Sequence, residues 1–372
     1  MKDALAEQLL AKVMSWDTAQ VTQERASLQD MARYKYDEYL QFAPGQRFIE
    51  SLALWLRQFA PGERPAAYDF FRKRLVFCGA AEMRHLVDAA FPCAVRPRLL
   101  QLAAEADNLP AHRIKAVFKT TSYKALRRRT LFLGLSDGAR TDMFRRANPD
   151  ISNEQIWHAY DFSERKAGDL GKELKKDLKE ILGRDPTEQE AKFRIVCLLD
   201  DFTGSGRTYL RPTEDGTAFS GKIAQIMEKL RLPTSALAPF LDVDRLETII
   251  VIYIASAQAV DYLTPELEKL AHPNERIVLK VIHALPPEFP LHEGRDDAML
   301  ALAGQDKYFD PAANTKATAV GGQDVRLGFS DGRLPLVLHH NTPNNSIYLL
   351  WAEPWHDVTA LFPRVSRHRN VS

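Results

Sequence analysis

An apolar run that ends in two acids constrains the fold of this chain more than any other feature. Residues 195–199 are all apolar, with no alternation, and Asp200 and Asp201 follow directly. An unbroken apolar run of this length is typical of a parallel strand that is covered on both faces. In open α/β sheets, ligands bind at the carboxyl ends of such strands. We therefore expect the two acids to lie at the ligand edge of a parallel sheet.

The loop after the acids is rich in small and hydroxyl side chains. Its residues are Thr203, Gly204, Ser205, Gly206, Arg207 and Thr208. Glycine lets the backbone come close to a ligand, and successive N–H groups can surround an anion. The loop therefore predicts a phosphate site beside two carboxylates. A polar turn that merely follows a strand is the simpler alternative.

This order of apolar strand, acid pair and Thr/Gly/Ser-rich loop resembles the motif of type I phosphoribosyltransferases that binds 5-phosphoribosyl diphosphate (PRPP). The resemblance implies that Asp200 and Asp201 are catalytic, lie along the ribose hydroxyls and contact Mg²⁺ through the Mg–PRPP complex. It also implies that residues 203–208 bind the 5-phosphate. Arg207 departs from the family pattern, which has glycine at this place. Its side chain could add a charged contact to phosphate or occlude the site.

A second loop fits the same resemblance. Residues 131–135 read as the first strand of an α/β domain. The loop that follows contains Ser136, Asp137, Gly138 and Arg140. By the resemblance this loop binds the diphosphate, with Gly138 permitting a tight backbone and Arg140 pairing with diphosphate oxygens. An exposed turn is the alternative, because Asp137 and Asp142 bring negative charge.

Strand and helix patterns alternate farther along the chain. Residues 247–255 read as another buried strand and residues 276–284 as a further strand, with a helix expected at residues 257–270 between them. Such alternation predicts a parallel sheet with right-handed crossovers. We therefore expect residues 126–372 to form a doubly wound α/β domain of phosphoribosyltransferase type.

Two further helices are expected between the two loops. Ser152 reads as the start of the first, whose apolar side would contain Ile156, Trp157 and Tyr160. Residues 164–182 alternate lysine with acids, as a solvated helix does. In the family a mobile segment at this place often closes over the site, and Lys172 or Lys176 could do so here.

The helix expected directly after the phosphate loop is displaced. Pro212 and Gly216 interrupt it, and the apolar spacing of a helix reappears only at residues 223–230. An insertion of this kind can reshape the phosphate site.

Residues 1–125 read as a series of short helices that are separated by proline and glycine, which predicts an all-helical amino-terminal domain. A winged-helix-like module is one alternative. A helical docking domain with no nucleic-acid role is favoured, because no dense basic recognition helix is visible. The run Arg127, Arg128 and Arg129 follows; it reads as a solvated face, or as a contact to a diphosphate or an RNA backbone.

A second candidate ligand edge lies near the carboxyl end. The short apolar run 336–338 leads into a segment that contains His340, Asn341, Asn344 and Asn345. These side chains could form a base or acceptor site, with His340 as an acid, a base or a hydrogen-bond donor. An Asx-rich turn that caps its own backbone explains the same residues equally well.

Composition limits the class of protein. A length of 372 residues suits two domains, and a formal net charge of +1 gives no global electrostatic case for nucleic acid or membrane binding. Cys78, Cys93 and Cys197 lie far apart, which argues against a disulfide framework or a zinc ribbon. The longest apolar runs are too short to span a bilayer. We expect a cytoplasmic protein with no membrane partner.

The acid-pair loop and the His-Asn-Thr-Pro-Asn-Asn segment together resemble the divergent phosphoribosyltransferase-like proteins of bacterial conflict and anti-phage loci, including those beside retron reverse transcriptases. The resemblance implies a glycosyltransferase-type effector that uses Mg²⁺ and PRPP or a related nucleotide, and a reverse transcriptase–nucleic acid complex as partner. The alternatives are a nucleotide-sensing module without turnover and a subunit of a nucleic-acid complex.

Overall fold

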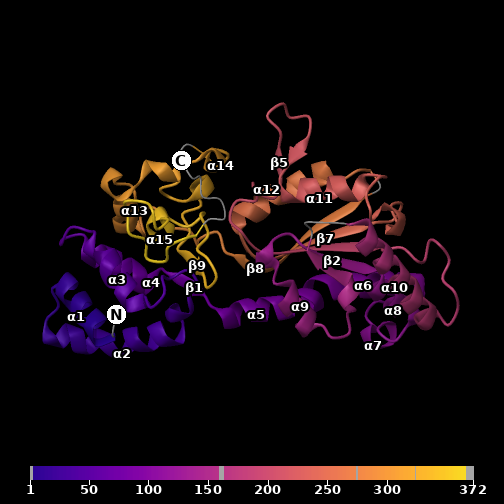
Figure 1. The fold of residues 1–372 in the computed structure, drawn as a ribbon, viewed down its shortest axis with the longest axis horizontal. Coiled ribbons are helices and arrows are strands. Elements are labelled where there is room, and N and C mark those ends of the chain that lie inside the picture. Colours follow the sequence, from indigo (N-terminus) through magenta and orange to yellow (C-terminus); the bar gives the residue numbers. More distant parts are fainter. Residues whose placement is uncertain (1–2, 159–162, 274, 323, 366–372) are drawn as a thin grey trace. The chain divides into compact units, whose positions relative to one another are not determined.

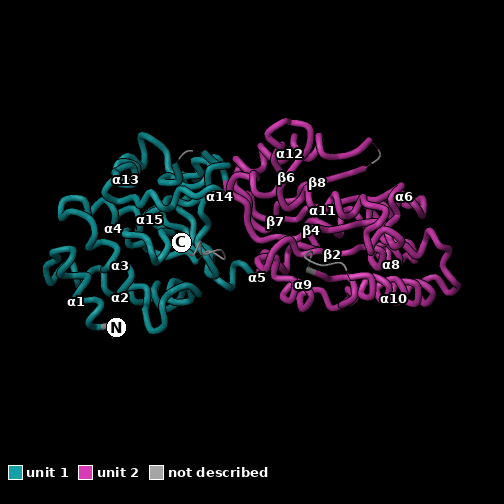
Figure 2. The backbone as a smooth tube through the Cα atoms, turned by 45° about the horizontal axis from the view of Figure 1, so that its top comes forward, with its two compact units in different colours: residues 1–83, 286–372 teal, residues 84–285 magenta. Residues whose placement is uncertain are grey.

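The computed structural model of the chain describes residues 3–158, 163–273, 275–322 and 324–365 (Figure 1). The chain divides into two compact units, which Figure 2 shows in different colours. The first unit combines Met1–Met83 with Pro286–Ser372, and the second unit is Arg84–Leu285.

The second unit is built on a sheet of five parallel strands. The strands are β2 (Thr130–Gly134), β3 (Ile156–His158), β4 (Ile195–Thr203), β7 (Glu247–Ser256) and β8 (Arg276–Leu285). Their order in the sheet is β3-β2-β4-β7-β8, and every neighbouring pair is parallel. The chain runs outward from β2 to β3, then returns past β2 to β4. The strand order therefore reverses between β2 and β4, and in such sheets this point is the usual ligand crevice.

Helices cover both faces of this sheet (Figure 1). One face carries α10 (Glu164–Leu182), α11 (Lys222–Arg231) and α12 (Ala257–Leu270), whose buried apolar residues share one core with alternate residues of the strands. On the other face, Phe132 of β2 packs against Phe91 and Phe144. These two residues come from the π-helix Ala90–Val95 and from α9 (Thr141–Ala147). The arrangement is a mixed α/β fold with a parallel sheet.

Further helices of the second unit precede the sheet in the sequence. They are α5 (Ala80–Ala89), which begins in the first unit, α6 (Arg96–Ala106), α7 (Ile114–Val117) and α8 (Thr121–Arg128). Helix α6 is fixed to the sheet by a bidentate ion pair, because Arg98 donates from Nε and Nη2 to the two carboxylate oxygens of Glu247, each over 2.7 Å.

Most elements of the sheet lie where the sequence predicts them, but two differ. Strand β4 continues four residues beyond the expected end at Leu199, so that Asp200 and Asp201 lie inside it. The helix expected from Ser152 is wrong, because a single 3₁₀ turn is followed by β3. The buried side chain of Gln155 donates to the carbonyl oxygens of Arg127 and Thr130, which holds this segment beside β2. Tyr160 lies outside the described residues.

The displaced helix after the phosphate loop is confirmed. Strands β5 (Arg211–Pro212) and β6 (Phe219–Ser220) form an antiparallel hairpin, which projects from the unit in Figure 1, and α11 begins only after it. Thr213 and Thr217 donate hydrogen bonds to Asp215 at the tip of this hairpin.

The first unit packs both ends of the chain around one apolar core. Its elements are α1 (Asp3–Met14), α2 (Thr18–Tyr34), α3 (Phe48–Arg57), α4 (Arg64–Lys73), β1 (Val76–Cys78), α13 (Asp297–Ala303), α14 (Lys316–Ala319), β9 (Leu336–Leu338) and α15 (Tyr348–Trp351). Strands β1 and β9 pair in parallel. Phe362 stacks on Phe48, and Trp55 donates from Nε1 to the carbonyl oxygen of Leu349 over 2.9 Å.

These units divide the chain differently from the predicted domains 1–125 and 126–372. Residues 84–125 belong with the sheet, because their helices cover one of its faces and carry Arg98. Residues 286–372 belong with the amino-terminal helices, because β9 pairs with β1. Among the described residues of the first 125, β1 is the one strand, and its parallel pairing differs from the antiparallel wing of a winged helix. No helix in the described ranges is long and apolar enough to cross a bilayer.

Candidate functional site

The two predicted loops meet where the strand order reverses. Gly134 of β2 lies opposite Leu199 of β4, and the amide of Leu135 donates to the carbonyl oxygen of Leu199 over 2.9 Å. The loop that begins at Ser136 therefore lies beside the acid pair. The structure thus brings together two predicted segments that are about sixty residues apart in the sequence.

Asp200 is fully buried, and both of its carboxylate oxygens accept hydrogen bonds. Oδ1 accepts from the hydroxyl of Ser136 and from the amide of Asp201, the latter over 3.1 Å. Oδ2 accepts from the hydroxyl of Tyr209 over 2.5 Å and from Nζ of Lys222 over 3.0 Å. Four donors thus surround a carboxylate that the family resemblance assigns to ribose hydroxyls. The structure places Asp200 in an ion pair with Lys222, in which the carboxylate is buried and the lysine partly exposed.

Burial dominates the electrostatics of this cluster. Burial and the neighbouring charge of Asp201 raise the pKa of Asp200, whereas Lys222 and the hydrogen bonds from Ser136 and Tyr209 act in the opposite direction. Burial and the charge of Asp200 also raise the pKa of Tyr209 well above its usual value, so the phenol keeps its proton and donates it. The cluster is therefore a set of donors that converge on one buried acceptor.

Asp201 points to the opposite face of β4, as successive residues of a strand do. Its side chain is partly buried, and Oδ1 accepts from the amide of Phe202 over 2.8 Å. Gly138 of the predicted diphosphate loop lies against this carboxylate, since a Cβ atom at Gly138 would come within 2.3 Å of Oδ2. The carboxylate therefore borders both the strand end and the neighbouring loop.

The rest of the predicted diphosphate loop is a short 3₁₀ turn. Asp137 is exposed, and Arg140 is partly buried with a left-handed backbone (φ 47°) at the start of α9. Tyr253 of β7 donates from its hydroxyl to the carbonyl oxygen of Ala139 over 2.6 Å, which fixes the turn to the sheet.

The loop at residues 203–208 leaves several of its amides unpaired. The hydroxyl of Thr203 accepts from the amide of Gly206 over 3.1 Å, and the hydroxyl of Ser256 donates to the carbonyl oxygen of Gly204 over 2.5 Å. Within the described part of the chain, the amides of Gly204, Ser205 and Thr208 have no hydrogen-bond acceptor. Unpaired backbone N–H groups in a short loop are suited to an anion.

Two residues of the loop contact α12. Gly206 has a φ of +74°, and a Cβ atom there would lie 2.7 Å from Cγ of Leu263, so the position requires glycine. The guanidinium of Arg207 lies over the ring of Tyr262, 5.0 Å from its centroid. A cation–π contact therefore accounts for the residue that departs from the family pattern.

Two contributors to the buried cluster, Tyr209 and Lys222, are not predicted from the sequence. Lys222 is the first residue of α11, and its amide donates to the carbonyl oxygen of Thr208 over 3.2 Å. Tyr209 directly follows the loop, so its place in the sequence is a signal that could have been used. Lys222 lies beyond the hairpin, 22 residues after Asp200, and no spacing rule connects the two.

The four residues of the second candidate edge lie in the first unit and contact other segments of it. Asn345 donates from Nδ2 to the carbonyl oxygen of Phe329, and Asn341 donates likewise to Val365. Backbone carbonyl oxygens of His340 and Asn344 also accept hydrogen bonds. These partners lie 16, 24 and 299 residues away in the sequence, so distant parts of the first unit fix the segment rather than its own backbone. The base or acceptor role of these residues stays a prediction.

The arginine run and the lysines of α10 are held in ion pairs. Arg128 is buried and donates to Asp177 over 2.6 Å, and Arg129 donates to Asp242 over 3.1 Å. Arg127 lies 3.4 Å from Asp150. On α10, the predicted closing residues Lys172 and Lys176 are exposed and face the acids Asp169 and Glu173 of their own helix.

A metal-binding cluster is not visible in the described residues, since no group of three or more His, Cys, Asp and Glu side chains could hold an ion there. Mg²⁺ in phosphate sites is usually held by one or two carboxylates, water and the phosphates of the substrate. Asp201 is a partly buried carboxylate at the strand reversal and fits that limited role. The hydrogen bonds around Asp200 leave it poorly suited to ligate a metal.

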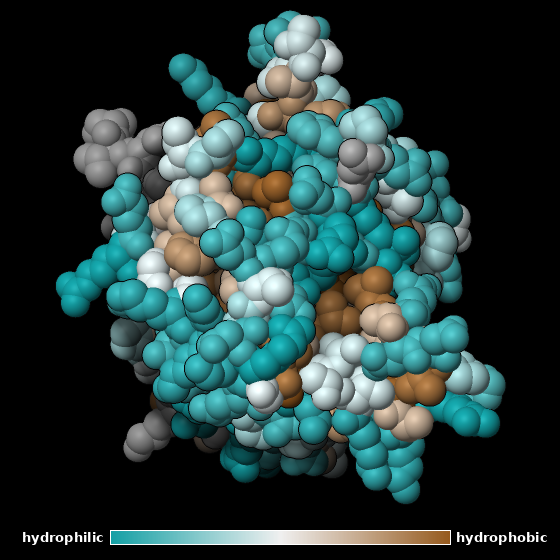
Figure 3. Space-filling model, turned by 90° about the vertical axis from the view of Figure 1, so that its right-hand side faces the viewer, coloured by the Kyte–Doolittle hydropathy of each residue, from teal (hydrophilic) through white to brown (hydrophobic). Residues whose placement is uncertain are grey.

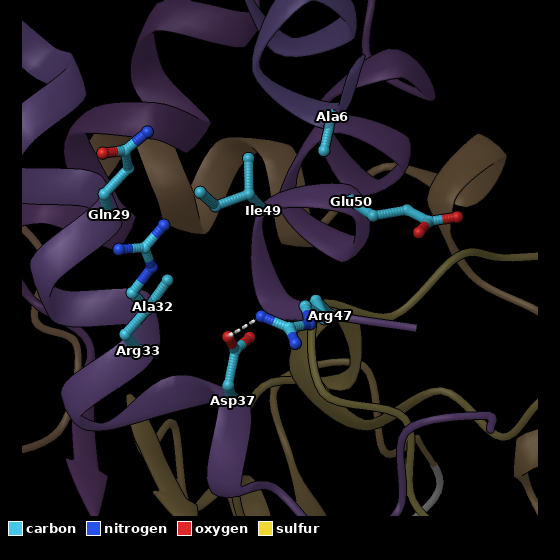
Figure 4. Close-up of a pocket in the computed structure, with 8 residues that line it drawn as sticks. All are labelled: Ala6, Gln29, Ala32, Arg33, Asp37, Arg47, Ile49 and Glu50. Carbon is cyan, nitrogen blue, oxygen red and sulfur yellow. Dashed lines mark ion pairs between the residues drawn. The ribbon is translucent and has the colours of Figure 1, made fainter. Parts of the chain in front are cut away.

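Two recesses are lined by residues other than the acid pair. A small one in the first unit is lined by side chains of α1, α2 and α3, and there Arg47 faces Asp37 with 3.8 Å between Nη1 and Oδ2 (Figure 4). The other lies in the second unit between α5, the π-helix and β8, and encloses about 360 Å³. The face drawn in Figure 3 is mostly hydrophilic, with separate small apolar areas.

Comparison with protein families gives a match over most of the chain. The model of the PRTase-CE family matches residues 52–364, which is well over half of the chain and includes both loops. Comparisons with curated proteins and with solved structures gave no match.

Proposed function

Because the chain belongs to the PRTase-CE family, a phosphoribosyltransferase-like family, we propose that it binds PRPP or a related nucleotide between the ends of β2 and β4. The observation that carries this proposal is the loop at residues 203–208, whose unpaired amides lie at the strand reversal beside Asp201. A phosphate on these amides would bring the ribose hydroxyls toward Asp201. The diphosphate would extend toward the loop that begins at Ser136.

The proposed reaction is transfer or release of the ribosyl phosphate at the anomeric carbon. The bond from this carbon to the diphosphate breaks, and the diphosphate takes the electron pair. An acceptor nucleobase or a water molecule then forms the new bond to the anomeric carbon. The sugar gains positive charge in the transition state, as in glycoside hydrolysis. The carboxylate of Asp201 would stabilise that charge, and Arg140 would contact the leaving diphosphate. Bound through the substrate, Mg²⁺ would neutralise charge on the departing phosphates.

Diphosphate release from PRPP in the presence of Mg²⁺ tests the catalytic proposal. We expect wild type to release diphosphate and Asp201→Asn to lose this activity while its thermal unfolding stays close to wild type. Glu173→Gln, which changes a partly exposed acid of α10, is the matched control. Failure of wild type to bind either PRPP or ribose 5-phosphate in calorimetry would refute the proposed ligand class.

A nucleotide sensor without turnover is the second candidate, and one observation favours it. Asp200 is fully occupied by four donors, so a single carboxylate of the pair remains at the ribose side. If PRPP binds in calorimetry but no diphosphate is released with any acceptor supplied, the protein is a sensor. Binding together with release would identify the enzyme.

We further propose a role in bacterial anti-phage defence, supported by the resemblance of the acid-pair loop and the carboxyl-terminal segment to proteins of conflict loci. The partner proposed on the same ground is a reverse transcriptase–nucleic acid complex. Plaque counts on cells that express wild type or Asp201→Asn, with the neighbouring genes present, test the role. Equal plaque counts for both would contradict it.

A further inference from the structure

The hairpin insertion changes how positive charge reaches the phosphate loop. In many phosphate sites the helix that follows the loop directs its N-terminal amides at the anion. Here the hairpin β5–β6 separates the two, and the first amides of α11 are already used. Lys222 donates to the carbonyl oxygen of Thr208 over 3.2 Å, and Ile223 donates to that of Tyr209 over 2.9 Å. These two amides of α11 therefore donate to backbone carbonyl oxygens and are not free to bind an anion.

Lys222 contacts residues on either side of the phosphate loop, one through its backbone and one through its side chain. Its amide is bonded to Thr208, the last loop residue, and its ammonium lies 3.0 Å from Asp200, three residues before the loop begins. The ammonium also lies 5.0 Å from the centre of the Tyr209 ring. Its side chain keeps 40% exposure while that of Asp200 has 0%. The buried carboxylate thus holds a cation that still reaches solvent.

The ammonium has hydrogen-bonding capacity left. A lysine ammonium has three donors, and within the described residues Asp200 is its one acceptor. Because 40% of its side chain is exposed, the lysine can offer these remaining donors to a ligand. A phosphate monoester carries up to two negative charges, and the neighbouring carboxylate of Asp201 opposes its approach. A cation at this point would offset that repulsion.

We propose that Lys222 is the phosphate-binding cation of this site and that Asp200 is its positioning residue. The inference rests on the proposed function, and it names a residue that the loop motif does not contain. It also gives the buried carboxylate a task other than binding the ribose. The ligand class is a sugar phosphate whose phosphate lies at residues 203–208.

The first test is calorimetric titration of the full chain with ribose 5-phosphate at several salt concentrations. We expect Lys222→Met to weaken binding about tenfold or more and to flatten its salt dependence, because a charged phosphate contact is lost. Lys222→Arg keeps the charge and should retain most of the affinity. Lys229→Met, which removes another lysine of the same helix, is the control and should bind like wild type.

The second test separates a phosphate contact from simple neutralisation of Asp200. The double variant Asp200→Asn/Lys222→Met removes both charges and leaves no buried carboxylate without its cation. If Lys222 contacts the phosphate, the double variant binds as weakly as Lys222→Met, and Asp200→Asn alone loses part of the affinity. The two changes are then not additive. Thermal unfolding of each variant shows whether it is folded under the titration conditions.

Two results would overturn the inference while the proposed function stands. One is equal binding of ribose 5-phosphate by wild type and a folded Lys222→Met. The other is recovery of wild-type affinity in the double variant, which would make Lys222 only the counter-ion of Asp200. If wild type binds neither ribose 5-phosphate nor PRPP, the proposed function and this inference fail together.

Discussion

Gly138 of the predicted diphosphate loop lies against the carboxylate of Asp201 on β4. A methyl group on Gly138 would meet the carboxylate oxygens and Cγ of Asp201 at 2.3 to 2.6 Å. The obstructing atoms are the end of a short side chain, which can rotate away. Filling this space should therefore displace the carboxylate of Asp201 while leaving the stability of the fold almost unchanged.

We accordingly expect Gly138→Ala to reduce affinity for ribose 5-phosphate by about tenfold, while the free energy of unfolding changes by less than about 1 kcal/mol. Gly168→Ala is the control, because that glycine lies on α10 and a Cβ atom there would have no other atom within 4 Å. Calorimetry and urea unfolding give the two quantities. Unchanged affinity in a folded Gly138→Ala variant would show that binding of ribose 5-phosphate does not depend on the present position of the Asp201 carboxylate.

Gly206 and Gly216 offer a matched pair with nearly equal backbone conformations. Their φ angles are +74° and +70°, but only at Gly206 would a Cβ atom meet other atoms, those of Leu263 and Tyr262. We expect Gly216→Ala to cost about 1 kcal/mol of stability from backbone strain alone. Gly206→Ala should cost about 1–3 kcal/mol more, because the added methyl group overpacks the contact with α12.

Urea unfolding of both glycine variants measures this difference. Equal losses of unfolding free energy would mean that α12 can shift to accommodate the methyl group. The close approach of the loop to α12 would then not contribute to stability.

The residues of the site differ in how far the sequence could reveal them. A loop at the end of the apolar strand could be predicted, because its signal is local: apolar residues, small residues and hydroxyls in one continuous stretch. Its phosphate-binding role stays a prediction. The role of Asp200 could not be predicted. Two of its four donors, Ser136 and Lys222, lie 64 and 22 residues away in the sequence. The register of β2 against β4 brings Ser136 to Asp200, and the start of α11 brings Lys222.

Among the elements, α6 shows how the helices before the sheet stabilise it. Arg98 forms two hydrogen bonds of 2.7 Å to Glu247 at the start of β7, and Arg194 adds a third over 3.2 Å. Burial opposes ionisation of Glu247, but the hydrogen bonds and charge of Arg98, with Arg194 nearby, hold its pKa below the usual 4.5. The carboxylate is therefore favoured in the folded state.

We expect Glu247→Gln to destabilise the protein by about 3–5 kcal/mol at neutral pH, because it leaves partly buried arginines without a counter-charge. The lowered pKa means that this stabilisation is present above pH 4.5 and is lost as the pH falls through the lower folded value. The difference in unfolding free energy between wild type and Glu247→Gln should therefore shrink on acidification below pH 4.5.

Urea unfolding at neutral and acidic pH measures this difference. Glu173→Gln removes one acid of a surface pair on α10 and should change stability by less than about 0.5 kcal/mol. A difference for Glu247→Gln that stays constant or grows toward acid pH would contradict the assigned pKa direction.

The elements themselves were predicted unevenly, for physical reasons. Strands β4 and β7 carry long apolar runs, and such runs have few alternative structures. Strand β3 has only three residues and follows a capping box at Ser152, which resembles a helix start. Its strand conformation depends on pairing with β2 and on the contacts of Gln155, neither of which is local in the sequence.

At the scale of the whole molecule, the predicted boundary near residue 125 follows a change in local pattern, whereas the compact units follow contacts between distant segments. Strand β1 (Val76–Cys78) pairs with β9 (Leu336–Leu338), and the hydroxyl of Tyr39 lies 2.9 Å from that of Thr342. No periodicity of residues 1–125 signals that a segment more than two hundred residues later completes their core.

The units lead to a prediction about fragments. We expect residues 84–285 expressed alone to unfold cooperatively, because this fragment retains all five strands of the sheet and the helices on both of its faces. A fragment of residues 126–372 should aggregate or remain partly unfolded. It lacks Phe91, which packs on Phe132, and Arg98, which pairs with Glu247. One face of the sheet would therefore be exposed. It would also contain β9 without β1.

Thermal unfolding followed by circular dichroism, together with size-exclusion chromatography, distinguishes the two fragments. Mixing residues 1–83 with residues 286–372 provides the complementary experiment, since each carries one strand of the β1–β9 pair and part of the same aromatic core. Cooperative unfolding should appear in the mixture and be absent from either piece alone. A well-folded, monomeric 126–372 fragment would mean that the helices before residue 125 are dispensable for the sheet. The sequence-based boundary would then be the better description of how this chain folds.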